Sequence, residues 1–403
     1  MTTAEEVPTY PFTQEDALRH PPELVERRSC PVSRVRLVSG DEALLLTGYD
    51  DVKAMLADPR FTRRLTAPDA ARLTASDSGG LFNEDSPIAQ MMEGDGHLRW
   101  RRMMGRTFTA RRVNAMRPRI EEIAHRLIDD MLAGERPTDL NAALGFPLPV
   151  FVICELLGVP AEERVRFAHW SDAMLNLNRY TEEELYTAAV EFHQFMAAHV
   201  RSKRAHPGDD LLSELAAVVD SEDGRLSEAE LIGTGQGLLV AGHETTASMI
   251  GKMMAVLLAD RRHYARLVED PTLVPSAVEE SLRADPNPGF GIPRYISEDI
   301  EVSGQKIPAG STVINSMAAA NRDARAFADA DEVVLDRKPN PHLAFGAGLH
   351  ACLGQALARV ELQSVLTVLT DRVPTLELAV PPSELRRKEG LIVGGLQELP
   401  VTW

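Results

Sequence analysis

The chain has 403 residues, 44% of them hydrophobic, which is enough apolar material for a sizeable core without forcing a division into several domains. The formal net charge of −17 disfavours nucleic acid and anionic membranes as partners, because the surface as a whole should repel them. Only three cysteines occur, and none lies in a CxxC pair, which argues against a disulfide framework and against structural zinc.

The N-terminus and the hydropathy pattern predict a cytoplasmic protein without a membrane anchor. The first residues are acidic and no apolar stretch follows them, so we do not expect a signal peptide. The most apolar segment, residues 144–159, is interrupted by two prolines and Glu155, and it is too short to span a bilayer. Without internal repeats, the chain is expected to form one domain over residues 1–403, present as a monomer.

The first half of the chain predicts one hairpin followed by helices. Residues 32–38 and 43–47 flank a Ser-Gly-Asp-Glu turn, a pattern typical of a β-hairpin. From Asp50 to about residue 285 the pattern is mostly helical. Its longest helix runs from Ser227 to about Ala259, with Ser227 and Glu230 as a capping box. A helix of ~50 Å, at about 1.5 Å per residue, should cross the domain and have neighbours on several sides.

Strands return after Pro286. Residues 300–307 predict a hairpin with Ser303-Gly304 at its tip, and residues 354–372 predict a helix. The fold class is therefore mainly α with a small β portion. We expect the β-rich parts near residues 32–47, 296–314 and 381–403.

The segment from Phe345 to Arg359 carries the most chemical information. Glycines on both sides of Cys352 allow the backbone to approach a flat ligand closely, and Cys352 stands where a helix begins. Backbone N–H groups there favour a thiolate. A thiolate without Cys or His partners at zinc spacing suggests an iron whose other ligands come from a macrocycle. A buried structural cysteine is the alternative, which the six matching positions of F-G-x-G-x-H-x-C-x-G disfavour.

This string resembles the cysteine signature of the cytochrome P-450 superfamily. The resemblance implies a triangular helical domain around haem b, with a long central helix. It implies that Cys352 is the proximal iron ligand and donates electron density that favours O–O cleavage. It also implies that Phe345 packs over the sulfur, that His350 lies near a haem propionate, and that Gly346 and Gly354 contact the haem. The sequence looks closest to actinobacterial members that tailor polyketides and other secondary metabolites.

The middle of the long helix, Ala241-Gly-His-Glu-Thr-Thr246, is costly for a helix interior. Glycine costs up to ~1 kcal/mol there, and a buried acid needs a partner. A polar helix face is one explanation. The segment also resembles the family's acid–alcohol pair, although many members have Asp in place of Glu244. This resemblance implies that Glu244 and Thr245 relay protons, that Ala241 and Gly242 line the haem, and that Gly242 leaves room for a diatomic ligand.

A glutamate and two arginines fit the same resemblance. Glu280 and Arg283 share a helix face at i,i+3 spacing, which alone is common on solvated helices. Together with Arg337 they resemble the family's Glu–Arg–Arg network, which we assign to the folding of the haem pocket.

Further basic residues resemble the family's propionate partners. His97 and Arg101, at i,i+4 spacing, point towards one anion. The preceding Glu-Gly-Asp-Gly departs from the family's usual Asp-Pro-Pro-Glu. Arg294 should pair with a propionate as well, although a lone arginine is most often a surface residue.

Residues 97–120 contain eight arginines and no acid. A solvated basic helix face is the ordinary explanation. The alternative is a docking patch for a ferredoxin, which with its reductase would supply the electrons. The arginines are Arg99, Arg101, Arg102, Arg106, Arg111, Arg112, Arg117 and Arg119.

The expected function is a haem-thiolate monooxygenase that inserts one oxygen atom from O₂ into a C–H or C=C bond of a hydrophobic secondary metabolite. A macrolide-like polyketide is the favoured substrate, with a terpenoid or a carrier-bound peptide unit as alternatives. A peroxide-driven or oxidative-coupling enzyme and a haem-based sensor are the competing functions. The implied pocket residues are Met91, Met92, Leu238, Pro288, Phe290, Ile392 and Val393.

Overall fold

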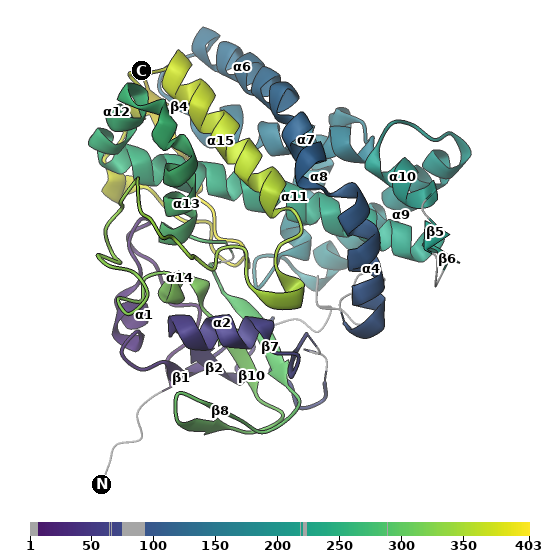
Figure 1. Ribbon diagram of the computed structural model, residues 1–403, viewed down its shortest axis with the longest axis vertical. Helices are drawn as coiled ribbons and strands as arrows, with labels where there is room; N and C mark the ends of the chain where they lie inside the picture. The colour runs from purple at the N-terminus through teal and green to yellow at the C-terminus, as the bar shows by residue number, and fades with distance from the viewer. Residues whose placement is uncertain are drawn as a thin grey trace.

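Helices dominate the computed structural model, which describes residues 7–63, 65, 67–74, 93–217, 219–220, 224–287 and 289–403. The main sheet lies at one side of the protein, whereas β4 (Thr138–Asp139) lies near the C-terminus and β5 (Val219–Asp220) and β6 (Gly224–Arg225) lie at the opposite edge, with helices between them (Figure 1). The mainly α fold with a small β portion is therefore confirmed. The first helices are α1 (Pro22–Arg27), α2 (Tyr49–Ala57), α4 (Gly94–Thr107), α5 (Ala110–Ala115), α6 (Arg117–Ala133), α7 (Pro147–Leu157), α8 (Arg164–Met174), α9 (Glu182–Ala205) and α10 (Leu211–Ala217).

The second half of the chain adds the central helix and the helices around it. These are α11 (Glu228–Ala259), α12 (Arg261–Glu269), α13 (Val274–Ala284), α14 (Met317–Ala320) and α15 (Gln355–Arg372). Short 3₁₀ turns occur at Ala161–Glu163, Pro271–Leu273, Gly348–His350 and Pro382–Glu384, and a π-helical turn at Asn141–Gly145.

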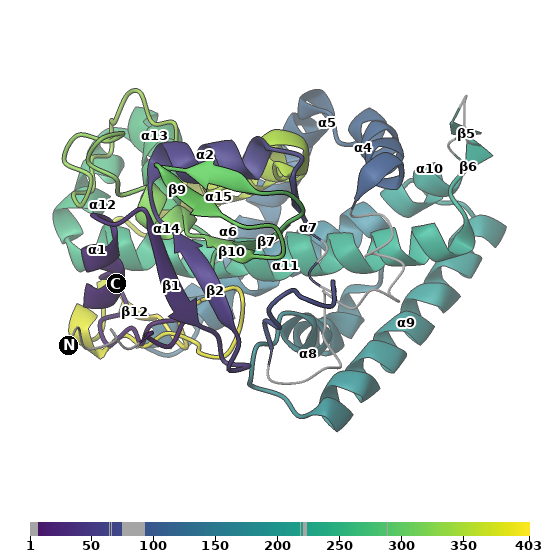
Figure 2. The ribbon, with the colours of Figure 1, turned by 90° about the horizontal axis from the view of Figure 1, so that it is seen from below.

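The long helix α11 crosses the whole protein, as Figure 2 shows. Its capping box forms as expected: the Ser227 hydroxyl accepts the Glu230 N–H, and the Glu230 carboxylate accepts the Ser227 N–H. Helices α7, α8, α9, α12, α13 and α15 all pack against it. Because neighbours surround it, most of its side chains are buried, including polar ones.

The main sheet has five strands in the order β1-β2-β10-β7-β3. The predicted hairpin is confirmed, with Val32 opposite Leu46 and Arg36 opposite Glu42. The second predicted hairpin is confirmed as well, and it pairs Ile300 with Ile307. The strands are β1 (Val32–Arg36), β2 (Glu42–Leu46), β3 (Phe61–Thr62), β4 (Thr138–Asp139), β5 (Val219–Asp220), β6 (Gly224–Arg225), β7 (Ile292–Ile296), β8 (Ile300–Val302), β9 (Gln305–Ile307), β10 (Thr312–Asn315), β11 (Glu377–Leu378) and β12 (Pro400–Thr402).

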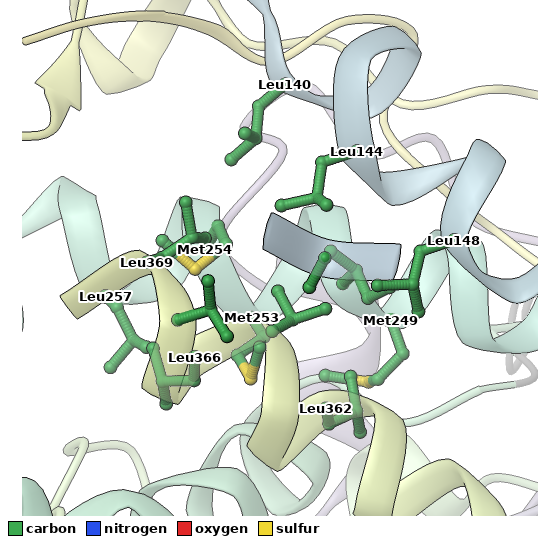
Figure 3. Packing of buried hydrophobic residues seen from close by; sticks show 14 of the residues in the cluster. Leu140, Leu144, Leu148, Met249, Met253, Met254, Leu257, Leu362, Leu366 and Leu369 are labelled. Carbon is green, nitrogen blue, oxygen red and sulfur yellow. The ribbon is translucent and has the colours of Figure 1, made fainter. Parts of the chain in front are cut away.

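The largest part of the core lies between α11 and α15. Figure 3 shows methionines and leucines of α11 interleaved with leucines of α15. Leu140 and Leu144, which precede α7, and Leu148 at its start complete this cluster. Met253 and Leu366, for example, have no exposed surface. Each such side chain contributes about 1.5–3 kcal/mol by leaving water. This packing fixes the start of α15, and with it the loop that carries Cys352.

Candidate active site

The loop before α15 is folded back on itself around Cys352. The Cys352 N–H donates to the Phe345 carbonyl at 2.8 Å, and Gly346 and Gly348 both have positive φ angles. A Cβ on Gly348 would lie 2.6 Å from the Cα of Ala57, so this glycine lets the loop pack against α2. The side chain of Cys352 remains exposed. The backbone therefore places the Sγ atom of Cys352 just before the N-terminus of α15.

Two opposing effects act on the Cys352 thiol. The protein atoms around the sulfur desolvate it and so raise its pKa, although part of the residue is accessible to solvent. Hydrogen bonds from the Gly354 and Gln355 amides and the charges of Arg101 and Arg359 lower the pKa. Desolvation is the larger effect, so the pKa of the free thiol stands above its ordinary value. The backbone amides at the helix start favour the thiolate, as the sequence suggested. Their effect on the pKa is smaller than the opposing effect of desolvation. A metal ion bound to the sulfur would remove the proton outright.

Basic side chains converge near the cysteine loop from three separate elements. The rings of His97 on α4 and His350 in the loop stack with centroids 4.2 Å apart. Arg294 on β7 is only 3% exposed, and its guanidinium donates to the carbonyl of Pro293 at 2.8 Å. Burial, then the charge of Arg63, lowers the pKa of Arg294 to about 9.

Burial and the charges of nearby arginines lower the pKa values of both histidines. Burial lowers the pKa of His97 to about 4, with Arg63 and Arg101 adding to the effect. Burial, then Arg63, likewise lowers the pKa of His350 to about 3. Arg63 was missed by sequence reasoning, since an isolated arginine 34 residues before His97 has no local pattern that would single it out.

Glu244 is buried in the middle of α11, with 2% of its surface exposed. The Ser248 hydroxyl donates to its Oε1 at 3.2 Å, and the Nζ of Lys388 lies 3.9 Å from the same oxygen. Burial raises the pKa of Glu244 to about 7, against the opposing charge of Lys388. A carboxyl group with such a pKa changes its protonation state near neutral pH, which suits proton transfer.

The neighbouring Thr245 has its hydroxyl proton already engaged. Its Oγ1 donates to the carbonyl of Ala241 one turn earlier. A hydroxyl has one proton and two lone pairs. Thr245 can therefore accept a hydrogen bond from another molecule through its oxygen lone pairs.

Gly242 has a packing role that the sequence did not suggest. An ideal Cβ there would lie 2.9 Å from the Cδ1 of Ile153 on α7. The glycine therefore allows α7 to pack closely against α11.

His243 is a buried polar residue that the sequence did not single out. It has no exposed surface, and neither ring nitrogen has a hydrogen-bond partner among the described residues. Its ring meets Phe146 edge-on, with centroids 4.6 Å apart. Burial, followed by the charge of Lys388, lowers the pKa of His243 to about 3.

Two ion-pair networks support the cysteine loop. The Glu280 carboxylate accepts hydrogen bonds from the guanidinium groups of Arg283 at 2.8 Å and Arg337 at 3.0 Å. The side chains of all three residues are almost fully buried. The structure thus brings together the three residues that the sequence grouped. A second network, missed by sequence reasoning, pairs Glu279 with Arg359 at 2.8 Å, and Arg359 in turn stacks on the Phe345 ring at 4.4 Å.

The expected substrate residues are brought together only in part. Phe290 and Ile392 are buried in one cluster, where the Phe290 N–H donates to the Ile392 carbonyl. Val393 and Leu238 pack in the neighbouring cluster. Met91, Met92 and Pro288 lie outside the described residues.

A hollow of about 380 Å³ borders Phe290. Its wall includes Tyr10 and Phe12, from a segment that the sequence gave no reason to place beside Phe290. Tyr10 is held there because its hydroxyl donates to the Phe290 carbonyl at 2.6 Å.

Acids from distant segments neutralise much of the arginine-rich region. Arg99 pairs with Glu230 and Arg112 with Glu214. Arg117 and Arg119 likewise have glutamate partners. In the part of the chain that the structure describes, Arg106 and Arg111 are exposed and have no carboxylate partner. The continuous basic patch that the sequence suggested is therefore smaller than expected.

The fold and this loop define a haem-thiolate class of protein, and comparison with known proteins agrees. The family model described as Cytochrome P450 matches residues 164–372. The chain is 43% identical to the mycinamicin IV hydroxylase/epoxidase of Micromonospora griseorubida over the full length of both chains. It is 42% identical to the nocardicin C N-oxygenase of Nocardia uniformis subsp. tsuyamanensis, with 98% of each covered.

A solved structure supports the same assignment. The LnmA cytochrome P450 hydroxylase of the leinamycin pathway of Streptomyces atroolivaceus superimposes with a TM-score of 0.88 at 41% identity, covering 98% of this chain and all of that one. The chain belongs to the cytochrome P450 family and is a monooxygenase. The family implies a haem, dioxygen, a small-molecule substrate and a redox partner. Within the described ranges, no helix has the length and apolar character needed to cross a bilayer.

His243 predicts a pH dependence of stability. The pKa of His243 is about 3 in the folded state and near 6.5 in the unfolded state. Below pH 6.5 the unfolded state therefore binds a proton that the native state does not bind. The free energy of unfolding should fall with decreasing pH in this window, by up to ~1.4 kcal/mol per pH unit from this residue. His243→Phe should flatten the slope measured by urea denaturation between pH 6.5 and pH 5. An unchanged slope would contradict the account, and the same substitution at exposed His193 is the control.

Proposed function

We propose that the chain binds haem b through Cys352 and oxidises a hydrophobic secondary metabolite. The observation that carries this proposal is the exposed sulfur of Cys352 beside an excess of buried positive charge. When bound, the haem supplies the binding and activation of dioxygen. Phe345, Gly346 and Gly354 on the cysteine side, and Ala241 and Gly242 on α11, would line its two faces.

The charge around the cysteine loop supports a dianionic cofactor. Arg63 and Arg101 lower the pKa of both His97 and His350, and Arg294 lowers that of His350. Among the described residues, the negative charge of Glu93 acts on both Arg63 and Arg294. A buried guanidinium such as that of Arg294 is costly without an anion. Two propionates would supply the missing charge, held by His97, Arg101, Arg294 and His350.

Residues on α11 would manage protons on the substrate side. Glu244 takes a proton from solvent and passes it on, because its pKa lies near neutral pH. Thr245, with its own proton on Ala241, accepts a hydrogen bond from the incoming water or oxygen species. Together they keep proton delivery at one place on the helix.

The relatives favour a macrolide-like substrate. The mycinamicin IV enzyme is named as both a hydroxylase and an epoxidase, whereas the nocardicin C enzyme is named as an N-oxygenase. The first name supports a macrolide-like polyketide and oxygen insertion into a C–H or C=C bond. Leu238, Phe290, Ile392 and Val393, with Met91, Met92 and Pro288, would form the apolar wall of the pocket.

A ligand panel tests this function. Macrolides, terpenoids and carrier-bound peptides are titrated into the purified haem protein, and the shift of the Soret band reports binding of the ligand near the haem. Turnover with ferredoxin, reductase and ¹⁸O₂ then follows for each ligand that binds. Binding of a macrolide with one ¹⁸O atom in its product supports the proposal. Turnover by peroxide alone, or no product from any class that binds, contradicts it.

We propose that a ferredoxin and its reductase supply the electrons. We also propose that the enzyme is a monomer and acts in the cytoplasm. Arg106 and Arg111 are the exposed cations near the cysteine side that stay without acid partners in the described chain. An acidic ferredoxin would be attracted to them, which raises the rate of encounter.

Reversing these two charges should slow reduction. In Arg106→Glu/Arg111→Glu, the rate of the first electron transfer from ferredoxin should fall roughly tenfold at low salt and less at high salt, because salt screens exposed charges. Stopped-flow measurement at two ionic strengths checks this. Arg19→Glu, on an exposed side chain of the N-terminal segment, is the matched control. Equal rates for both variants would exclude this docking patch.

Thr245→Ala should separate electron use from product formation. Without the acceptor oxygen, product formed per electron pair should fall about tenfold, or ~1.4 kcal/mol, while hydrogen peroxide rises. Measured NAD(P)H consumption, peroxide and product give the ratio. Unchanged coupling would exclude the role given to Thr245.

Glu244 predicts the pH dependence of turnover. Its raised pKa of about 7 means that the proton-donating form predominates below neutral pH and is lost as the pH rises through 7. The ratio of product to electrons should fall above pH 7 in the parent enzyme. Glu244→Gln should lower turnover and remove that step, whereas a retained step at pH 7 would assign it to another group.

A further inference from the structure

The turn from Asp285 to Asn287, just after α13, contacts α11 at two points. The Nδ2 of Asn287 donates to the backbone carbonyl of Thr245 at 2.6 Å. The Nζ of Lys252 lies 3.1 Å from Oδ1 of Asp285 and 3.3 Å from the carbonyl of Pro286. Thr245 and Lys252 are seven residues apart, which is two helical turns and places them on one face of α11.

The orientation of the Asn287 amide is fixed by its partner. A backbone carbonyl only accepts, so the nitrogen of Asn287 must face Thr245. Its Oδ1 is buried and has no partner among the described residues. A helix carbonyl has two lone pairs and can accept this bond beside its ladder bond, and such an extra donor tilts the peptide outward.

Buried charges hold the turn in place. Asp285 binds Lys252, which has no exposed surface, and Arg387, whose guanidinium also donates to the carbonyl of Ala17. Burial acts to raise the pKa of Asp285, but Arg387 and Lys252 outweigh it and keep the pKa below its ordinary value. The turn is therefore fixed to α11, to the C-terminal loop and to the N-terminal segment.

We propose that Asn287 is a positioning residue for Thr245. By holding the Thr245 peptide, it keeps the hydroxyl in the conformation that donates to Ala241 and leaves the oxygen lone pairs available. The effect passes through Thr245, and Asn287 itself does not contact the reacting atoms. The inference rests on the proposed role of Thr245 and names a second residue on which that role depends.

The test is a double-mutant cycle of Asn287→Ala with Thr245→Ala. Asn287→Ala should lower product per electron about fivefold, the change expected from one net hydrogen bond. Because Asn287 acts through Thr245, adding it to Thr245→Ala should produce almost no further loss. The substrate dissociation constant from the Soret shift should stay unchanged, and amide hydrogen exchange across residues 245–249 should become faster.

Two further variants keep the proposal open to refutation. Asn287→Asp retains the shape but cannot donate at neutral pH, so it should uncouple at least as strongly as the alanine. Tyr264→Phe removes another buried bond to a backbone carbonyl, that of Val373, and should leave coupling unchanged.

The outcomes separate the inference from the function it rests on. If Thr245→Ala uncouples but Asn287→Ala does not, or if the two effects add, the positioning role of Asn287 is wrong while the role of Thr245 stands. If Thr245→Ala itself leaves coupling intact, the proposed proton relay fails, and the inference fails with it.

Discussion

The burial of α11 is the constraint on which the rest of the structure depends. This helix of 32 residues packs against α7, α8, α9, α10, α12, α13 and α15, and most of its side chains are buried. Most of the buried polar groups discussed above meet a partner on the helix or on another part of the chain, whereas the ring nitrogens of His243 have none within the described residues. Glu244 is met by Ser248 and Lys388, Lys252 by Asp285, and the Thr245 carbonyl by Asn287. The acid–alcohol pair is thus held by the tertiary structure as a whole.

The same packing places the cysteine loop. Leucines of α15 interleave with methionines of α11, so the N-terminus of α15 and the sulfur of Cys352 have a fixed position relative to Thr245 and Glu244. The Glu280 and Glu279 networks then fix the segment that leads into the loop. The fold therefore holds the sulfur of Cys352 and the side chains of Glu244 and Thr245 in fixed relative positions.

Local patterns predicted a good part of this arrangement. The capping box and long apolar run marked α11, the two hairpins followed from their turns, and the spacing of Glu280 and Arg283 placed both on one face. The glycines around Cys352 marked the loop before α15, in which Gly346 and Gly348 have positive φ angles. Each of these features depends on residues close together in the chain.

What could not be predicted depends on contacts between distant segments. Arg63, Lys388 and Asn287 are single residues without any periodic context, and only tertiary packing brings them to the site. The arginine-rich region looked continuous because its acid partners, such as Glu214 and Glu230, lie about a hundred residues further on. The packing role of Gly242 could not be predicted for the same reason, since Ile153 belongs to another helix.

The central claim is that Cys352 ligates a haem iron as a thiolate, and the spectrum of the reduced protein with carbon monoxide tests it most directly. The parent should show the long-wavelength Soret band that distinguishes thiolate ligation. Cys352→His should shift the band to the position of an imidazole-ligated haem while retaining bound haem. A parent spectrum of the imidazole type, or a Cys352→His spectrum identical to the parent, would contradict the account.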